Sequence, residues 1–287
     1  MKKFVTEHQS PYLDLSAEVS EILYEGKSDF QDIIVADSKE FGRMLVLDGV
    51  FQTSDKDEFI YHECITHIPL FLHPNPKNVL IIGGGDGGAA REAVRHPEVE
   101  HVTMVDIDGK VIELSKQFFP AISKAMRENN PKLTVKVGDG IAFMREAKDF
   151  YDVIIVDCSD PVGPGEGLFT YEFYKDTFKA LKEDGLFVQQ TESPFMHSKL
   201  VREIKDCVSD IFPITRLYTA FIPLYPTGMH CFTMGSKKYD PLTWEPNRTR
   251  TFPTKYYNEG IQRSAFVLPN FVKDVLYGEK IAKRKST

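Results

Sequence analysis

Short runs of apolar and β-branched side chains characterise the first 57 residues. Two of these runs, Phe30 to Val35 and Met44 to Leu47, have the length and composition of strands. Asp48-Gly49 then separates the second run from the apolar segment Val50 to Gln52. A two-residue Asp-Gly between apolar runs predicts a tight hairpin, because both positions tolerate a positive φ. We therefore expect residues 1–57 to form a small domain of β-hairpins.

From residue 58 to the end of the chain the pattern alternates between strand-like and helix-like segments. Strands are predicted at residues 79–82, 101–105, 133–137, 153–156 and 185–189, and helices at residues 57–71, 89–95, 110–118, 141–147 and 170–181. This alternation is typical of a parallel sheet with helices on both faces. The sequence predicts an α/β protein, with a Rossmann-like, doubly wound sheet over residues 58–287.

Four consecutive predicted strands lead directly into an acidic residue. These residues are Asp86, Asp106, Asp139 and Asp157. A single acid after a strand is often a helix cap. In an open parallel sheet, however, ligands bind at the carboxyl ends of the strands. Four acids in succession therefore predict a shared binding crevice.

The first of these strand ends carries a glycine-rich turn. Gly83, Gly85 and Gly88 satisfy the GxGxxG pattern between a predicted strand and a predicted helix. Asp106 ends the next strand and can accept hydrogen bonds from ribose hydroxyls. Asp139 ends the third strand and can accept a bond from the adenine amine. A tight turn with a capping acid is the plainer interpretation, but the pattern favours an adenosine ligand.

Asp86 lies inside the glycine turn and narrows the choice of ligand. A dinucleotide would bring a pyrophosphate there, and two like charges ~4 Å apart at an effective dielectric of about 20 repel by about 4 kcal/mol. An S-adenosyl ligand instead brings a sulfonium and an amine, which Asp86 would attract. Ordinary S-adenosylmethionine also carries a carboxylate. An acidic pocket would therefore favour the decarboxylated compound.

Composition excludes several classes of function. The chain has 35 basic and 42 acidic residues and a formal net charge of −7, which disfavours nucleic acid as a partner. Its four cysteines form no CxxC pair, so no metal site is expected. No apolar run approaches the roughly 20 residues of a membrane span, and the N-terminus lacks an apolar signal core. We expect a cytoplasmic protein without a membrane partner.

The fourth strand runs into the segment VDCSDPVGPGEGLFT. Asp157 and Asp160 lie three residues apart in it, and Pro161 to Gly167 cannot continue a strand or a helix. An ordinary surface turn with two solvated acids is one interpretation. The second is a loop at residues 158–170 that closes over the crevice and excludes water.

Six segments match a known family in the same order along the chain. They are LDGVFQTSDKDEFIYHE (Leu47 to Glu63), GGGDGG (Gly83 to Gly88), VDID (Val105 to Asp108), GDG (Gly138 to Gly140), DCSDPVGP (Asp157 to Pro164) and YPTG (Tyr225 to Gly228). On these segments the sequence resembles the spermidine synthases, or polyamine aminopropyltransferases. The resemblance implies an N-terminal β domain, a Rossmann-like domain of methyltransferase type, and a homodimer or homotetramer.

The resemblance also implies a reaction. The aminopropyl group of decarboxylated S-adenosylmethionine would move to a diamine, usually putrescine, giving spermidine and methylthioadenosine. The donor is a co-substrate, and no further cofactor is expected. Agmatine, cadaverine or a longer polyamine stays open as the acceptor. Three competing functions are an S-adenosylmethionine methyltransferase, a nicotinamide dehydrogenase and a non-catalytic binding protein, and the set of acids in the crevice argues against each of them.

Individual roles follow from the resemblance residue by residue. Asp157 matches the catalytic acid, with Tyr61 beside it. The donor site is expected to comprise Gln31, Gln52, Gly83, Gly85, Asp86, Asp106, Ile107, Asp139, Gly140 and Pro164. The acceptor site is expected to comprise His62, Asp86, Asp157, Asp160, Glu192 and Tyr225. Two positions depart from many members of the family: His62 stands where some have Gln, and Cys158 stands where many have Ser.

Overall fold

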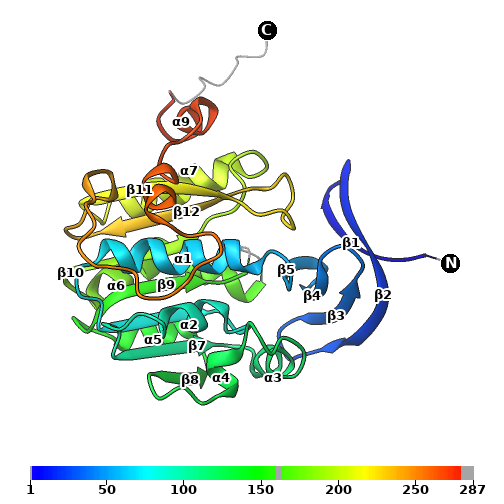
Figure 1. Cartoon of the computed structure of the whole chain (residues 1–287). Coiled ribbons are helices and arrows are strands. Elements are labelled where there is room, and N and C mark those ends of the chain that lie inside the picture. Colours follow the sequence, from blue (N-terminus) through cyan, green and yellow to red (C-terminus); the bar gives the residue numbers. More distant parts are fainter. Residues whose placement is uncertain (1, 160–162, 279–287) are drawn as a thin grey trace, which may run out of the picture.

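The computed structural model describes residues 2–159 and 163–278, which form two β-sheets with helices around the larger one (Figure 1). The smaller sheet is antiparallel, and its five strands lie in chain order. They are β1 (Lys3–Ser10), β2 (Leu13–Lys27), β3 (Asp32–Ser38), β4 (Gly42–Leu47) and β5 (Val50–Ser54). Within the described residues, no helix combines the length and the apolar character needed to cross a bilayer.

The predicted hairpin at Asp48-Gly49 is confirmed. Both residues have a positive φ, 48° at Asp48 and 80° at Gly49, and they join β4 to β5. Residues 1–57 were expected to form β-hairpins, but no individual run was assigned to β1 or β2. β2 is 15 residues long and only two of its side chains are buried, so its sequence lacks the apolar run that identified β3 and β4. Its strand character comes from pairing with β1 and β3.

The larger sheet has seven strands in the order β11-β12-β10-β9-β6-β7-β8. Their bounds are β6 (Asn78–Gly83), β7 (His101–Asp106), β8 (Leu133–Val137), β9 (Tyr151–Asp157), β10 (Leu181–Gln190), β11 (Ile214–Phe221) and β12 (Met229–Ser236). The five strands from β8 to β10 are parallel, as predicted. β12 is antiparallel to both β10 and β11. The sheet is therefore mixed: the predicted strands form its parallel part, and β11 and β12 at this edge were not predicted.

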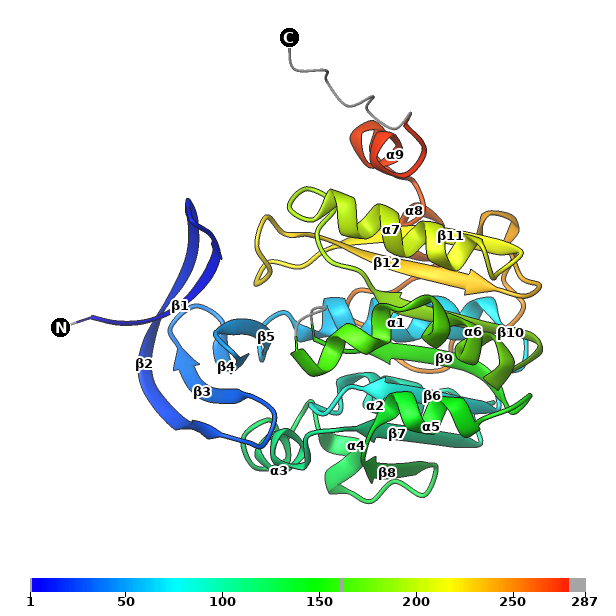
Figure 2. The same ribbon diagram turned by 180° about the vertical axis from the view of Figure 1, so that it is seen from behind.

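Helices cover both faces of the larger sheet, which is the doubly wound arrangement (Figures 1 and 2). They are α1 (Glu58–Leu72), α2 (Gly88–Ala93), α3 (Gly109–Phe118), α4 (Lys124–Arg127), α5 (Gly140–Glu146), α6 (Tyr171–Ala180), α7 (Ser198–Ser209), α8 (Glu259–Ser264) and α9 (Asn270–Tyr277). Val79 and Ile81 of β6 point into the core under α1, whereas Leu80 and Ile82 point into the core on the other face. Burial on both faces explains the unbroken apolar run of this strand.

The smaller sheet packs beside the carboxyl ends of the parallel strands (Figures 1 and 2). Apolar side chains of β3 and β4, including Ile33 and Leu45, pack against Val111 and Phe119 at α3. On the other side, Asp57 accepts a hydrogen bond of 2.7 Å from the backbone N–H of Leu224. These contacts hold the small sheet over the edge where the four predicted acids emerge. The boundary between a β-hairpin domain at residues 1–57 and a Rossmann-like domain at residues 58–287 stays a prediction.

Candidate active site

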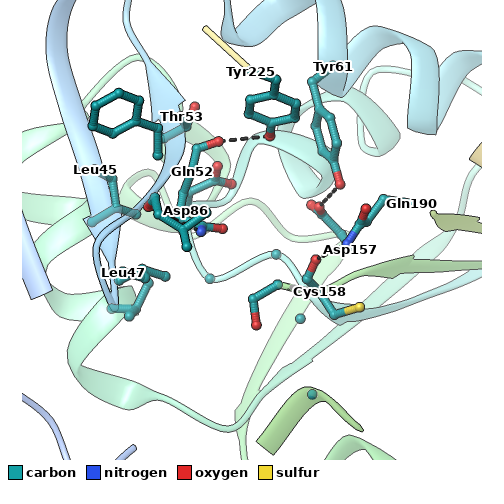
Figure 3. A pocket seen from close by; sticks show the side chains of 18 of the residues that line it. Leu45, Leu47, Gln52, Thr53, Tyr61, Asp86, Asp157, Cys158, Gln190 and Tyr225 are labelled. Carbon is teal, nitrogen blue, oxygen red and sulfur yellow. Dashed lines mark hydrogen bonds between the residues drawn. The ribbon is translucent and has the colours of Figure 1, made fainter. Parts of the chain in front are cut away.

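A cavity lies at the carboxyl ends of the parallel strands, between the larger and the smaller sheet (Figure 3). Asp86, Asp106, Asp139 and Asp157 all line it, as the sequence pattern predicted. β4 and β5 contribute Leu45, Leu47, Gln52 and Thr53 to the opposite wall. One cavity therefore receives side chains from both sheets.

Close contacts within the protein require glycine at several positions of the glycine turn. The backbone N–H of Gly84 donates a 2.7 Å hydrogen bond to the carbonyl of Asp157. Gly83 has a φ of +81°, and a Cβ there would lie 2.2 Å from the same carbonyl oxygen. A Cβ on Gly88 would lie 2.3 Å from the ring of His62. The turn thus joins β6 to the end of β9 and leaves room for a buried imidazole.

Asp86 is paired with His62. His62 Nε2 lies 3.1 Å from Asp86 Oδ2, and His62 Nδ1 lies 2.6 Å from Glu58 Oε2. Burial disfavours a charge on the imidazole, but the two carboxylates outweigh burial and hold the pKa of His62 well above its usual value. Burial would likewise raise the pKa of Asp86, yet His62 keeps it lowered.

This pairing corrects the electrostatics inferred from the sequence. Asp86 is not an isolated charge, because an imidazolium already balances it. Arg91 balances Glu58 in the same way, with its two terminal nitrogens 2.9 Å and 2.8 Å from the Glu58 carboxylate. The glycine turn therefore presents an ordered ion-pair network to a ligand, and its net negative charge is smaller than the sequence suggested.

Asp157 and Tyr61 face each other from β9 and α1 (Figure 3). The Tyr61 hydroxyl donates a 2.6 Å hydrogen bond to Asp157 Oδ1. Asp157 Oδ2 is buried and has no hydrogen-bond partner among the described residues. Burial, reinforced by Asp86, raises the pKa of Asp157 to about 6. Burial and Asp157 also raise the pKa of Tyr61, so its hydroxyl stays protonated. The orphaned oxygen is available to accept a proton from a ligand.

Asp106 and Asp139 occupy the side of the cavity predicted for adenosine. Asp106 accepts a 2.8 Å hydrogen bond from the backbone N–H of Asp108, and burial raises its pKa to about 6. Asp139 Oδ1 accepts the N–H groups of Ile141 at 2.8 Å and Ala142 at 3.3 Å. Asp139 therefore does cap α5, through one of its two oxygens. Two further predicted donor residues line the cavity beside these acids: Ile107 and Gly140.

Gln31 and Gln52 reach the cavity from the smaller sheet. The Gln31 side chain donates a 2.8 Å hydrogen bond to Asp108 Oδ2, which fixes its amide beside the ribose-side acids. The Tyr225 hydroxyl donates a 2.9 Å hydrogen bond to the backbone carbonyl of Gln52 (Figure 3). The Tyr225 ring also lies 5.9 Å from the Tyr61 ring, edge-on. These contacts join the two predicted halves of the site.

Several residues at the Tyr225 end of the cavity were missed by the sequence reasoning. Glu7 of β1 is 1% exposed and accepts a 2.8 Å hydrogen bond from the Phe51 N–H. Burial raises the pKa of Glu7 to about 7. His230 of β12 lies 3.0 Å from Gln190 Oε1, and burial lowers its pKa to about 4. Neither strand was predicted, so nothing in the sequence indicated that these side chains reach the site.

Two predicted residues fall at the lid segment. Asp160 lies outside the described residues, so its place in the site stays a prediction. Pro164 lies in the 3₁₀ helix η1 (Gly163–Phe169). Gly165 and Leu168 of η1 line the cavity. Part of the segment 158–170 thus borders the cavity, and its closure over a ligand stays a prediction.

Among the residues that the structure describes, two groups of side chains lie close enough together to hold a metal ion: His62 with Asp86 and Asp157, and His73 with Asp152 and Asp184. In the first group both ring nitrogens of His62 already face carboxylates. In the second, the Lys182 ammonium lies 2.9 Å from both oxygens of Asp152. These contacts favour ion pairing in both groups.

Family comparisons agree with this geometry. Residues 58–244 match the model of the spermine/spermidine synthase domain, and residues 4–55 match that of the spermidine synthase tetramerisation domain. The chain belongs to the spermidine synthase family. The members of this family are polyamine aminopropyltransferases, so the chain is an enzyme of that class.

Related proteins match this chain over nearly its whole length. A polyamine aminopropyltransferase of Shouchella clausii is 51% identical over 96% of this chain and 100% of its own. A polyamine aminopropyltransferase of Bacillus cereus is 49% identical over 96% of this chain and 100% of its own. Among solved structures, a spermidine synthase in complex with the transition-state analogue AdoDATO has a TM-score of 0.92 at 40% identity, covering 96% of this chain and 94% of its own. The spermidine synthase of Thermotoga maritima has a TM-score of 0.91 at 40% identity over the same shares.

Proposed function

We propose that this enzyme transfers the aminopropyl group of decarboxylated S-adenosylmethionine to putrescine, giving spermidine and methylthioadenosine. One observation carries the proposal. Asp157 has one oxygen held by Tyr61 and the other buried without a partner among the described residues. It lines the same cavity as the donor-side acids and Tyr225. A proton acceptor in this place suits an amine that attacks a donor carbon.

The chemical step has a simple balance of atoms and electrons. The acceptor nitrogen forms a bond to the donor carbon, and the carbon–sulfur bond breaks. Sulfur keeps the electron pair and leaves as a neutral thioether, so no oxyanion develops. The nitrogen must lose one proton, and Asp157 Oδ2 receives it. Positioning the nitrogen, carbon and sulfur in line supplies much of the rate.

Obtaining a neutral amine is the difficult part of the reaction. An aliphatic amine has a pKa of about 10, and nearby carboxylates stabilise its protonated form. The donor sulfonium acts in the opposite sense. Tyr61 holds one oxygen of the Asp157 carboxylate and leaves the second without a hydrogen bond among the described residues. We assign Asp157 as the general base and Tyr61 as the residue that positions it.

The donor side suits an adenosine that ends in an ammonium. In this proposal Asp106 accepts hydrogen bonds from the ribose hydroxyls and Asp139 from the adenine amine, and Gln31 lines the same cavity. Asp86 holds the donor's ammonium as one partner of an ion pair, and His62 keeps Asp86 ionised. The ionised state of Asp86 supports a preference for a ligand without a carboxylate.

The acceptor side suits a short diamine. Glu192 and Glu7 lie at the end of the cavity formed by Tyr225 and His230, and their carboxyl groups are close enough for Glu192 to raise the pKa of Glu7 further. They would bind the remote ammonium of the acceptor, together with Asp160 if the family's pattern holds. Agmatine, cadaverine and longer polyamines differ from putrescine in length and in their remote end, so they are the competing acceptors to test.

The deciding experiment mixes the purified enzyme with decarboxylated S-adenosylmethionine and one amine at a time. We expect methylthioadenosine and spermidine in equal amounts with putrescine, and smaller yields with cadaverine, agmatine and spermidine at equal concentration. A parallel reaction with EDTA should proceed at the same rate, because no metal takes part in the proposed step. A higher yield with another amine would change the acceptor. Methyl transfer from ordinary S-adenosylmethionine would contradict the reaction class.

We also propose that the enzyme forms a homodimer or a homotetramer. The match of residues 4–55 to the spermidine synthase tetramerisation domain supports self-association. Sedimentation equilibrium distinguishes the two states. Removal of the N-terminal sheet should lower the order of assembly if this sheet forms the contact.

A further inference from the structure

The loop after β10 carries Glu192 in a constrained conformation at the acceptor end of the cavity. Glu192 has a φ of +68°, which a residue with a side chain rarely adopts. Two hydrogen bonds hold it there: its N–H donates to Gln190 Oε1 at 3.1 Å, and its carbonyl accepts the Cys231 N–H at 2.8 Å. Such strain is common at binding sites. With its backbone in this conformation, Glu192 lines the cavity.

His197 meets this carboxylate from the start of α7. Its Nδ1 lies 3.2 Å from Glu192 Oε2, and its side chain is 37% exposed at the cavity wall. The His197 N–H donates to the Ser193 carbonyl at 2.8 Å, and its own carbonyl accepts the Val201 N–H at 3.0 Å. These two hydrogen bonds fix the backbone of His197 through both its N–H and its carbonyl group. The imidazole is placed over Glu192 by the fold.

The neighbouring titratable groups among the described residues do not supply a cation to Glu192. Glu7 approaches from β1, and its raised pKa of about 7 leaves it partly protonated near neutrality. His230 approaches from β12, and its pKa of about 4 leaves it neutral. The pairing with Glu192 raises the pKa of His197, against a smaller effect of burial. Among these groups, His197 is the cation that Glu192 meets before a substrate arrives.

We propose that His197 is a specificity-determining residue, whose imidazolium competes with the remote ammonium of the acceptor for the carboxylate of Glu192. The inference rests on the proposed function, because it assumes an acceptor with a positive charge at its far end. An acceptor must share Glu192 with His197 or displace it. An amine without a second charge gains nothing from displacing it. The contact thus sets how strongly the enzyme discriminates between acceptors, and it makes that discrimination depend on pH.

The direction of the pH effect follows from the pairing. Below the raised pKa of His197 the ring is charged and occupies Glu192, so the KM for a diamine is high. Above that pKa the ring is neutral and no longer competes for Glu192, so the KM falls. The amines of the acceptor, Asp157 and Glu7 also titrate, but they do so in the wild type and in a variant at position 197 alike. The ratio of the two KM values at each pH isolates His197.

The kinetic test compares the wild type with His197→Asn between pH 6 and pH 9. The exposed residue His101 lies outside the cavity, and His101→Asn serves as the matched control. At pH 6.5 we expect the KM for putrescine to be roughly two- to fivefold lower in His197→Asn, the size expected for a partly exposed ion pair. The two values should converge at pH 8.5. The kcat and the KM for the donor should not change.

Two further measurements make the result specific. In a Glu192→Gln background, His197→Asn should have no effect on the KM for putrescine. The inhibition constant of butylamine, which has the same four-carbon chain and no second amine, should be the same in the wild type and in His197→Asn. A KM ratio that is constant with pH, a higher KM in His197→Asn, or a fall in kcat alone would overturn the proposal.

A titration followed by NMR keeps this test separate from the proposed function. The pKa of His197 should be above that of a free imidazole, fall in Glu192→Gln, and fall when putrescine and methylthioadenosine are added together. An unchanged pKa on adding both compounds would overturn the competition. If no amine accepts the aminopropyl group in the assay, the proposed function fails, while this titration still decides whether His197 and Glu192 are paired.

Discussion

The donor side and the acceptor side of the cavity are built in different ways. On the donor side, the acids stand at the ends of neighbouring strands, and backbone N–H groups or ion pairs hold each of them. On the acceptor side, Glu7, Glu192 and His230 come from segments far apart in the chain. The first arrangement is fixed by the sheet itself. The second depends on one loop and on two strands from different sheets, β1 and β12.

The largest expected effect lies where the two sides meet. Asp157→Asn removes the proposed base while keeping the hydrogen bond from Tyr61. We expect kcat to fall by about 10²- to 10⁴-fold, the usual contribution of a general base, with a smaller change in both KM values. In the wild type, kcat should also fall as the pH drops through about 6, where Asp157 becomes protonated. A near-normal kcat in Asp157→Asn would remove the base assignment.

A substitution in the glycine turn tests the donor side. Asp86→Asn removes the carboxylate proposed to hold the donor's ammonium, which is also the group that does most to keep His62 charged. We expect the KM for decarboxylated S-adenosylmethionine to rise by roughly tenfold or more, because a hydrogen bond to a charged group contributes about 1.5–3 kcal/mol. Selectivity over ordinary S-adenosylmethionine should fall as well. Binding of both compounds measured by calorimetry checks this, and unchanged selectivity would contradict the role of Asp86.

Packing in the same turn affects stability. Gly88→Ala places a methyl group 2.3 Å from the ring of His62. We expect it to lower the free energy of unfolding by about 1–3 kcal/mol, the usual cost of overpacking. Gly138→Ala is the matched control, because a Cβ there meets nothing within 4 Å. Thermal unfolding of both variants checks the prediction. Equal stability of the two would show that the turn adjusts around His62.

The smallest effect is expected at the hydrogen bond between Tyr225 on the acceptor side and Gln52 on the donor side. Tyr225→Phe removes the hydrogen bond to the Gln52 carbonyl and keeps the ring beside Tyr61. We expect the KM for putrescine to rise by roughly two- to tenfold, since such a bond contributes about 0.5–1.5 kcal/mol. The KM for the donor should change less. A larger change for the donor than for the acceptor would mean that Tyr225 belongs to the donor side.

The same contrast explains what could be predicted from the sequence. Asp86 and Asp106 follow β6 and β7, whose apolar runs are largely buried and mark the strand ends. Asp139 follows the edge strand β8, whose residues are all partly or fully exposed and whose β-branched run marks it instead. Glu7 lies on β1, whose alternation is too weak to identify a strand, and its burial depends on pairing with β2 and on contact with Phe51. The charge on His62 could not be predicted either. It arises from Glu58, one helical turn away, together with Asp86, 24 residues further along the chain.

The hydrogen bond from Gly84 to the Asp157 carbonyl has a consequence for how new acceptors could arise. It ties the turn on the proposed donor side to the proposed base, so this part of the site is held by a frame that involves neither Glu192 nor His197. Substitutions at the far end of the cavity can then change which amine enters without realigning the reacting atoms. The chemical step and the choice of amine can then change independently of each other during evolution.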